Sequence, residues 1–166
     1  MIAFSIIDVK DFMNKLLIGE VFDRFFLVEA SVTTFNTFTI DGRLQQNFFD
    51  TDTAAMYKSN QIEYSQWRDI KSYCFSVIRG KRTPLNFKII LQLSHSQAKK
   101  LLEQSGYTDS VPFCSFCLNL QYRNDSLLCT TGVSYAAFCP DKRPEHLWDE
   151  TIRHFFSDQN IPFQIL

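Results

Sequence analysis

Glycine is scarce in this sequence, with five in 166 residues, and so are the short motifs that mark common enzymes. There is no Gly-rich phosphate loop, no Gly-x-Ser-x-Gly nucleophile elbow and no His-Glu-x-x-His zinc motif. These absences remove the P-loop nucleotide-binding, serine-hydrolase and zinc-protease classes. They favour a binding protein over an enzyme without deciding the question, and we assign no catalytic residues, no bound metal and no cofactor.

The sequence also lacks an excess of charge of either sign and any long apolar run. Its formal net charge is −1, so no overall field attracts polyanions or acidic surfaces to the whole molecule. The segment Met1–Asp8 has no basic leader, and its apolar run is too short for a secretory signal or a membrane span. Five cysteines, an odd number, occur in a chain long enough to fold without disulfides. We expect reduced thiols, a cytoplasmic location and no membrane partner.

Aromatic residues are plentiful, with 17 Phe and 6 Tyr, and 45% of the chain is hydrophobic. A chain of this length and composition is typical of one folded domain with a substantial core, here residues 1–166. Apolar periodicity and turn residues predict the following elements. They are a strand (2–7), a helix (9–17), a hairpin (24–49) that turns at Asp41-Gly42, a loop (50–61), a helix (62–79), a strand (85–93), a short helix that starts at Ser94 and ends before Gly106, a hairpin (114–138), a helix with Pro144 in its first turn, and a strand (161–166).

The order strand, helix, hairpin, helix occurs twice, in residues 1–84 and again in residues 85–166. The run from Trp67 to Cys74 aligns with the run from Trp148 to Phe156 after a one-residue gap, which favours an internal duplication, although unrelated amphipathic helices share such patterns. We predict an α+β fold with a mainly antiparallel sheet and helices packed on it. The aromatic helix faces, including both tryptophans, should form the core.

Four segments resemble an uncharacterised family of short bacterial single-domain proteins. They are Asp8-Val-Lys-Asp-Phe-Met13, Phe38-Thr-Ile-Asp-Gly42, Ile78-Arg-Gly-Lys-Arg-Thr-Pro84 and Cys129-Thr-Thr-Gly132. This resemblance implies a single domain over the full chain and supplies no catalytic residues. The duplicated element order is also similar to that of one DNA sliding-clamp domain, but no clamp motif accompanies it, and fold alone does not fix function.

The main local feature is a basic segment, with six basic residues and one acid between Arg68 and Lys88, a net charge of +5. On a helix several of these cations share one stripe with an aromatic ring, opposite the apolar face. Such a stripe can grip phosphates and stack on a base. We therefore predict a non-enzymatic intracellular binding protein whose partner is nucleic acid or an acidic protein surface. The predicted binding residues are Arg68, Lys71, Phe75, Arg79, Lys81, Arg82 and Lys88.

The alternative interpretation of this segment is a solvated helix face whose cations favour the helix C-terminus through its dipole. A second functional hypothesis is a metal-assisted hydrolase that uses Asp50 and Asp52, which stand in a phosphatase-like Phe-Phe-Asp-Thr-Asp-Thr run, or the helix that carries His146, Glu150 and His154. The first run is more simply a polar turn, and the second group an exposed pairing on one helix.

Cys114-Ser-Phe-Cys117 has the spacing of zinc and redox sites. On a strand these two side chains would point to opposite faces, so we expect thiols without a metal or redox role. A third hypothesis for the whole chain is a self-associating structural protein, because so many aromatic residues can leave an apolar patch for a second subunit.

Overall fold

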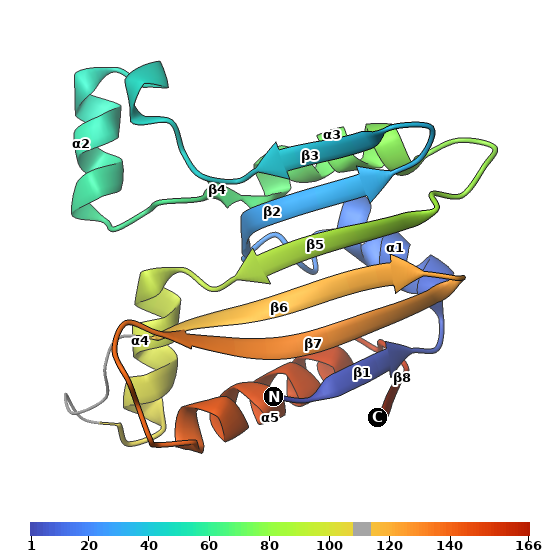
Figure 1. Cartoon of the computed structure of the whole chain (residues 1–166). Helices are drawn as coiled ribbons and strands as arrows, with labels where there is room; N and C mark the ends of the chain where they lie inside the picture. Colours follow the sequence, from blue (N-terminus) through green and yellow to red (C-terminus); the bar gives the residue numbers. More distant parts are fainter. Residues whose placement is uncertain (108–113) are drawn as a thin grey trace.

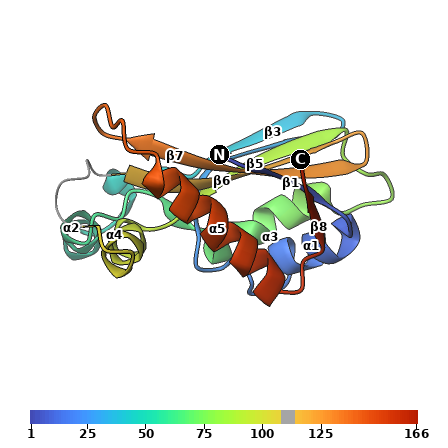
Figure 2. The same cartoon turned by 90° about the horizontal axis from the view of Figure 1, so that it is seen from below.

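A single antiparallel sheet with helices on one face makes up the fold (Figures 1 and 2). The computed structural model describes residues 1–107 and 114–166. Within them the elements are β1 (Ala3–Ile6), α1 (Val9–Leu17), β2 (Phe26–Thr33), β3 (Thr37–Asp41), a 3-10 turn (Gln46–Phe48), α2 (Thr51–Ser59), β4 (Ser65–Gln66), α3 (Trp67–Ile78), β5 (Asn86–Gln92), α4 (His95–Gln104), β6 (Cys114–Arg123), β7 (Ser126–Tyr135), α5 (Arg143–Asp158) and β8 (Phe163–Ile165). The predicted α+β class is confirmed.

The strands follow the order β3-β2-β5-β6-β7-β1-β8, with β4 paired to β2 beside β3. The described ladders are all antiparallel, and β6 and β7 form the longest hairpin, which turns at Asn124 and Asp125, both with positive φ. Strand β1 lies between β7 and β8, so the first strand of the chain pairs with the second strand of the β6–β7 hairpin and with the last strand. β3 and β8 are the two edges of the sheet.

The core lies between the sheet and the helices α1, α3 and α5, which lie against the same face (Figure 2). Alternation along β5 sends Phe87, Ile89 and Leu91 into this core. Trp67, the first residue of α3, and Trp148, in the second turn of α5, are fully buried, and the predicted core placement of both is confirmed. The opposite face is uncovered by helices and carries mostly Ser, Thr, Asn and Gln.

The predicted hairpin turn at Asp41-Gly42 is wrong, because the chain turns earlier, at residues 34–36, and β3 ends at Asp41. Gly42 is buried where the backbone passes close to β2, and an added Cβ would overlap the carbonyl oxygen of Leu27. The glycine is required for close approach rather than for a turn.

The predicted returning strand (43–49) and loop (50–61) are also wrong. Residues 43–64, called the arm below, leave the sheet between β3 and β4 and carry the 3-10 turn and α2 (Figure 1). Its two ends are joined by a bridge between Arg43 and Tyr64 and by a hydrogen bond from the Leu44 N–H to the Glu63 carbonyl, 2.8 Å. No side chain of α2 is buried, so the helix has no apolar stripe.

The two predicted halves occupy the sheet differently. β5 pairs with β6, the first strand of the hairpin that follows it, whereas β1 does not pair with β2. Both tryptophans do play the same part, since Trp67 donates from Nε1 to the Leu16 carbonyl (2.8 Å) and Trp148 donates to the Cys117 carbonyl (2.7 Å). The duplication stays a prediction.

None of the helices in the described part is both long and apolar enough to span a membrane.

Candidate functional site

A pocket of about 450 Å³ lies between α1, the end of α3, the α3–β5 connection and the β6–β7 turn. We call it the basic pocket. Its apolar lining comes from the half-buried side of α1 and, across the pocket, from residues of α3, the α3–β5 connection, β5 and β6. These lining residues are Val9, Met13, Leu17, Ile18, Phe75, Ile78, Pro84, Phe87 and Tyr122.

Cations surround the mouth of this pocket. Lys10, Arg79 and Arg82 line it and are exposed, and Lys81 lies between the two arginines in the α3–β5 connection. Asp125 is the one acid in the described lining, against three cations. None of these four cations forms an ion pair within residues 1–107 and 114–166. Their charge is available to a ligand.

The aromatic rings of the pocket are mostly engaged with one another. Phe87 and Tyr122 stack at 5.2 Å between centroids and are buried, and the Tyr122 hydroxyl donates to Asp125 at 2.9 Å. Phe75 is half-buried, and the guanidinium of Arg79 lies 5.9 Å from its ring centroid. Phe75, which was expected to be exposed and to stack on a base, therefore forms part of the pocket wall.

Lys71 does not join this group. Its ammonium donates to the Asp23 carboxylate at 2.6 Å and to the Gly19 carbonyl at 2.8 Å, and both charged side chains are largely buried. The pair ties α3 to the connection between α1 and β2. Asp23 therefore already neutralises the Lys71 charge within the fold.

Arg68 and Lys88 also lie apart from the basic pocket. Arg68 stands in the first turn of α3 near Asp69 (3.7 Å), about 16 Å along the helix axis from Arg79. Lys88 points from β5 to the uncovered face of the sheet, because its neighbours Phe87 and Ile89 enter the core. The structure thus brings together Phe75, Arg79, Lys81 and Arg82 and separates the other three residues of the predicted site. The binding role of all seven stays a prediction.

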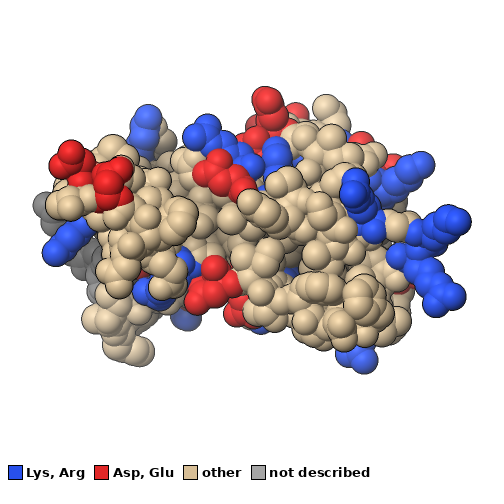
Figure 3. All heavy atoms as spheres, turned by 90° about the horizontal axis from the view of Figure 1, so that it is seen from above, with Lys and Arg blue, Asp and Glu red and all other residues tan. Residues whose placement is uncertain are grey.

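Figure 3, which looks down on the β3 edge, shows Lys and Arg side chains gathered at the right end of the molecule. The α3–β5 connection lies at this end in Figure 1. Acidic side chains appear mainly at the left and in the middle of the same view. Cations therefore predominate at the right end of this view, although Lys and Arg side chains also appear at the left and in the middle.

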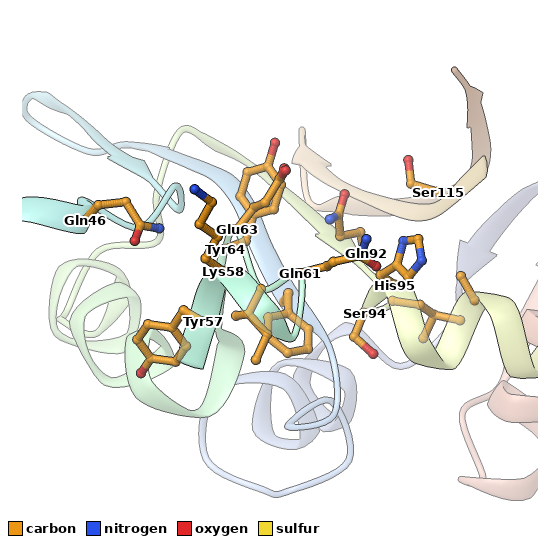
Figure 4. Close-up of a pocket in the computed structure, with 14 residues that line it drawn as sticks. Gln46, Tyr57, Lys58, Gln61, Glu63, Tyr64, Gln92, Ser94, His95 and Ser115 are labelled. Atoms are coloured by element: carbon orange, nitrogen blue, oxygen red, sulfur yellow. The ribbon is translucent and has the colours of Figure 1, made fainter. Parts of the chain in front are cut away.

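A second, larger space of about 960 Å³ lies between the arm and α4. Figure 4 shows Gln46, Tyr57 and Lys58 on the arm side and Ser94 and His95 on the α4 side. Among Lys, Arg, Asp and Glu, its lining residues are Lys58 and Glu63, one of each sign. This arm cleft does not share the charge of the basic pocket.

The residues of the hydrolase hypothesis have structural partners. Asp50 is the N-cap of α2 and accepts a hydrogen bond from the Thr53 N–H at 2.7 Å, which lowers the pKa of its carboxyl below the ordinary 3.8. The predicted polar turn is therefore a helix start. Glu150 on α5 pairs with Arg153. In the described part of the chain no three His, Cys, Asp or Glu side chains are grouped so that they could hold a metal ion.

Burial raises the pKa of the Cys117 thiol, and the side chain of Cys114 lies outside the described residues. The free thiols of Cys74, Cys117, Cys129 and Cys139 are buried or half-buried.

Sequence reasoning missed the contribution of α1 to the site. Val9 and Met13 belong to the predicted apolar stripe of α1, but they are only half-buried, unlike Phe12 and Leu16 behind them. Lys10 stands beside this partly open side. The sequence did contain a signal for this role: the apolar stripe of α1 is wider than the face that packs against the core, so part of it is left for a pocket.

Comparison with known proteins gives a family and no function. Searches of curated proteins and of solved structures found no match. The sliding-clamp resemblance therefore has no support from them, whereas the resemblance to an uncharacterised family is confirmed. One sequence model, described as "Family of unknown function (DUF5721)", matches residues 15–164, and the chain belongs to this family.

Proposed function

We propose that the protein is a non-enzymatic binding protein and that the basic pocket binds an acidic protein segment through one apolar anchor side chain. The observation that carries the proposal is the combination of an apolar interior with exposed cations, Lys10, Arg79, Lys81 and Arg82, that have no ion-pair partner in the described structure. Apolar pockets with a few convergent polar groups are the usual form of binding sites.

The lining favours an acidic protein segment over nucleic acid. Cations are enough to contact the phosphates of a nucleic acid, but binding of its bases also needs an aromatic ring that is free to stack. Phe87 and Tyr122 already stack on each other, and Phe75 is half-buried against the core. An aliphatic or aromatic side chain of a peptide fits the apolar interior, and flanking carboxylates then meet the arginines.

Reduced thiols support a cytoplasmic site of action. Four cysteines with described side chains are free, and burial raises the pKa of Cys74 to about 11, which keeps that thiol neutral and unreactive.

Fluorescence anisotropy with three labelled probes tests the proposal. The first probe is a peptide library with one Leu, Ile, Phe or Met flanked by Glu, the second has Lys in place of Glu, and the third is an oligothymidylate. We expect the Glu-flanked peptides to bind most tightly, with affinity that falls as salt is raised. The double variant Arg79→Ala/Arg82→Ala should weaken their binding about tenfold or more.

A matched control is Lys99→Ala/Lys100→Ala, which removes two exposed cations from α4, away from the basic pocket. This variant should bind like the unchanged protein. Equal affinity for Glu- and Lys-flanked peptides, or binding unaffected by loss of Arg79 and Arg82, would refute the proposal. Preferential binding of oligothymidylate would replace it with the nucleic-acid hypothesis.

A further inference from the structure

The arm contains the kind of segment that the basic pocket is proposed to bind. Its sequence Phe48-Phe49-Asp50-Thr51-Asp52 places an aromatic anchor next to two carboxylates. Phe48 is 84% exposed, and neither Asp50 nor Asp52 forms an ion pair within the described residues. The Phe48 ring and the Asp52 carboxylate therefore face solvent, while Asp50 caps α2 through the Thr53 N–H.

The arm also lacks the packing that usually holds a short helix. α2 has nine residues and buries none of them. Isolated helices below about 12 to 15 residues are marginal in water. The contacts of Phe49 with Phe48 and Tyr57, at 5.4 and 5.0 Å between ring centroids, hold the arm together but leave Phe48 and Met56 in solvent. An ordered arm with this exposure fits a docking element.

The edge strand β3 next to the arm is open to another strand. Its sequence Thr37-Phe38-Thr39-Ile40-Asp41 contains no Lys, no Pro and no bulge, which are the usual protections of an edge. Phe38 is partly exposed at this edge, and Phe35, in the turn before it, is 86% exposed and lies 5.8 Å from Phe38 between ring centroids.

A second copy of this chain satisfies these features together. Antiparallel pairing of all five β3 residues with their equivalents places Thr39 on a two-fold axis and Phe38 beside the partner copy's Ile40. In this arrangement the arm end of each β3 meets the turn end of the other. The arm of one copy then lies at the end of the second copy that carries the α3–β5 connection.

Charge is complementary in the same arrangement. Glu29 and Asp41 lie opposite each other on neighbouring strands at the arm end. The arm adds the acids Asp50, Asp52 and Glu63 against the cations Arg43 and Lys58, so acids exceed cations at this end. The turn end carries the cations of the basic pocket, and Figure 3 shows Lys and Arg side chains concentrated at this end. The two-fold arrangement brings each acidic end to a basic end.

We infer that the protein forms a symmetric dimer through β3, in which the arm of each copy places Phe48 in the basic pocket of the other. The inference rests on the proposed function, because it names the acidic segment that the pocket binds.

Light scattering after size exclusion measures the dimer. We expect the unchanged protein to be a dimer, and Phe48→Lys and Arg79→Glu/Arg82→Glu each to raise the dissociation constant about tenfold or more. Phe138→Lys is the matched control, since Phe138 is 91% exposed on the connection between β7 and α5. Mixing Arg79→Glu/Arg82→Glu with Asp50→Asn/Asp52→Lys should restore the dimer, and circular dichroism confirms that each variant is folded.

Thr39→Cys tests the register. At the two-fold axis the Cα atoms of paired residues are about 4.5 to 5.5 Å apart, within the range of a disulfide. Oxidation should cross-link this variant, whereas Gln164→Cys on the opposite edge strand should stay monomeric on a denaturing gel.

A monomeric unchanged protein, no cross-link at Thr39→Cys, or a dimer unaffected by the Phe48 and Arg79/Arg82 variants would each overturn the inference. The peptide assay on Phe48→Lys, which has no anchor to compete for the pocket, separates the two proposals. If that variant binds Glu-flanked peptides while the unchanged protein is a monomer, the proposed function stands and the dimer does not.

Discussion

Replacement of Lys71 by Met separates the structural cation of the basic segment from the cations proposed to bind a partner. The Lys71 side chain is 15% exposed and that of Asp23 23%, and their ion pair at 2.6 Å is reinforced by the Gly19 carbonyl. Breaking a fully buried pair destabilises a protein by about 3 to 5 kcal/mol, and an exposed pair contributes about 0 to 1 kcal/mol. The partial exposure places Lys71→Met between these limits, at about 2 to 3 kcal/mol.

Thermal unfolding measures this loss. For a chain of this size each kcal/mol lowers the Tm by roughly 2 to 4 °C, so Lys71→Met should lower it by about 4 to 12 °C. Lys81→Met, on the exposed connection, should leave the Tm within about 2 °C of the unchanged protein. Adding Asp23→Leu to Lys71→Met should recover part of the loss, because no uncompensated charge stays near the core. Equal melting temperatures for Lys71→Met and Lys81→Met would refute the reasoning.

Three further experiments test the fold and the arm. Trp148→Ala should lower the free energy of unfolding by about 3 to 5 kcal/mol, and a urea titration that shows less than about 1 kcal/mol would contradict its buried position. Because burial raises the pKa values of Cys74, to about 11, and of Cys129, both thiols should resist alkylation in the native protein and react after unfolding, as mass spectrometry can show; rapid native labelling would disprove their burial. The hydrogen bond from Thr53 lowers the pKa of Asp50, so the ionised carboxylate stabilises the start of α2 above the unfolded value of 3.8, and this contribution is lost as pH falls through the folded pKa. The protection of the Thr53 amide, measured as its exchange rate relative to the intrinsic rate at each pH, should fall over this range in the unchanged protein and stay constant in Asp50→Asn; constant protection in both would contradict the cap.

The sequence predicts those elements whose side chains alternate between core and solvent. α1 and α5 bury apolar stripes, and the β6–β7 hairpin alternates in period two, so their positions are correct within a few residues. α2 was missed because it buries no side chain, and hydrophobic periodicity exists only where a face is buried. Asp41-Gly42 has the residues of a tight turn, but the same glycine also permits close backbone contact with Leu27, and local sequence does not distinguish the two uses.

The candidate site shows the same limit over longer distances. Charge density identified Arg79, Lys81 and Arg82, which are neighbours in the chain. Lys10 lines the same pocket only because α1 packs beside α3. The charge of Lys71 is not available at the pocket because Asp23, 48 residues away in the chain, neutralises it. Both facts depend on tertiary contacts between distant segments, and no local pattern contains them.

The attachment of the arm has a consequence for engineering. β3 and β4 both pair with β2, and the arm leaves and re-enters the sheet at the Arg43–Tyr64 bridge. Since the two ends are already adjacent, a short turn can replace everything between them without moving a core residue. The same junction can accept a foreign loop or tag, which makes this position the natural insertion point for a reporter.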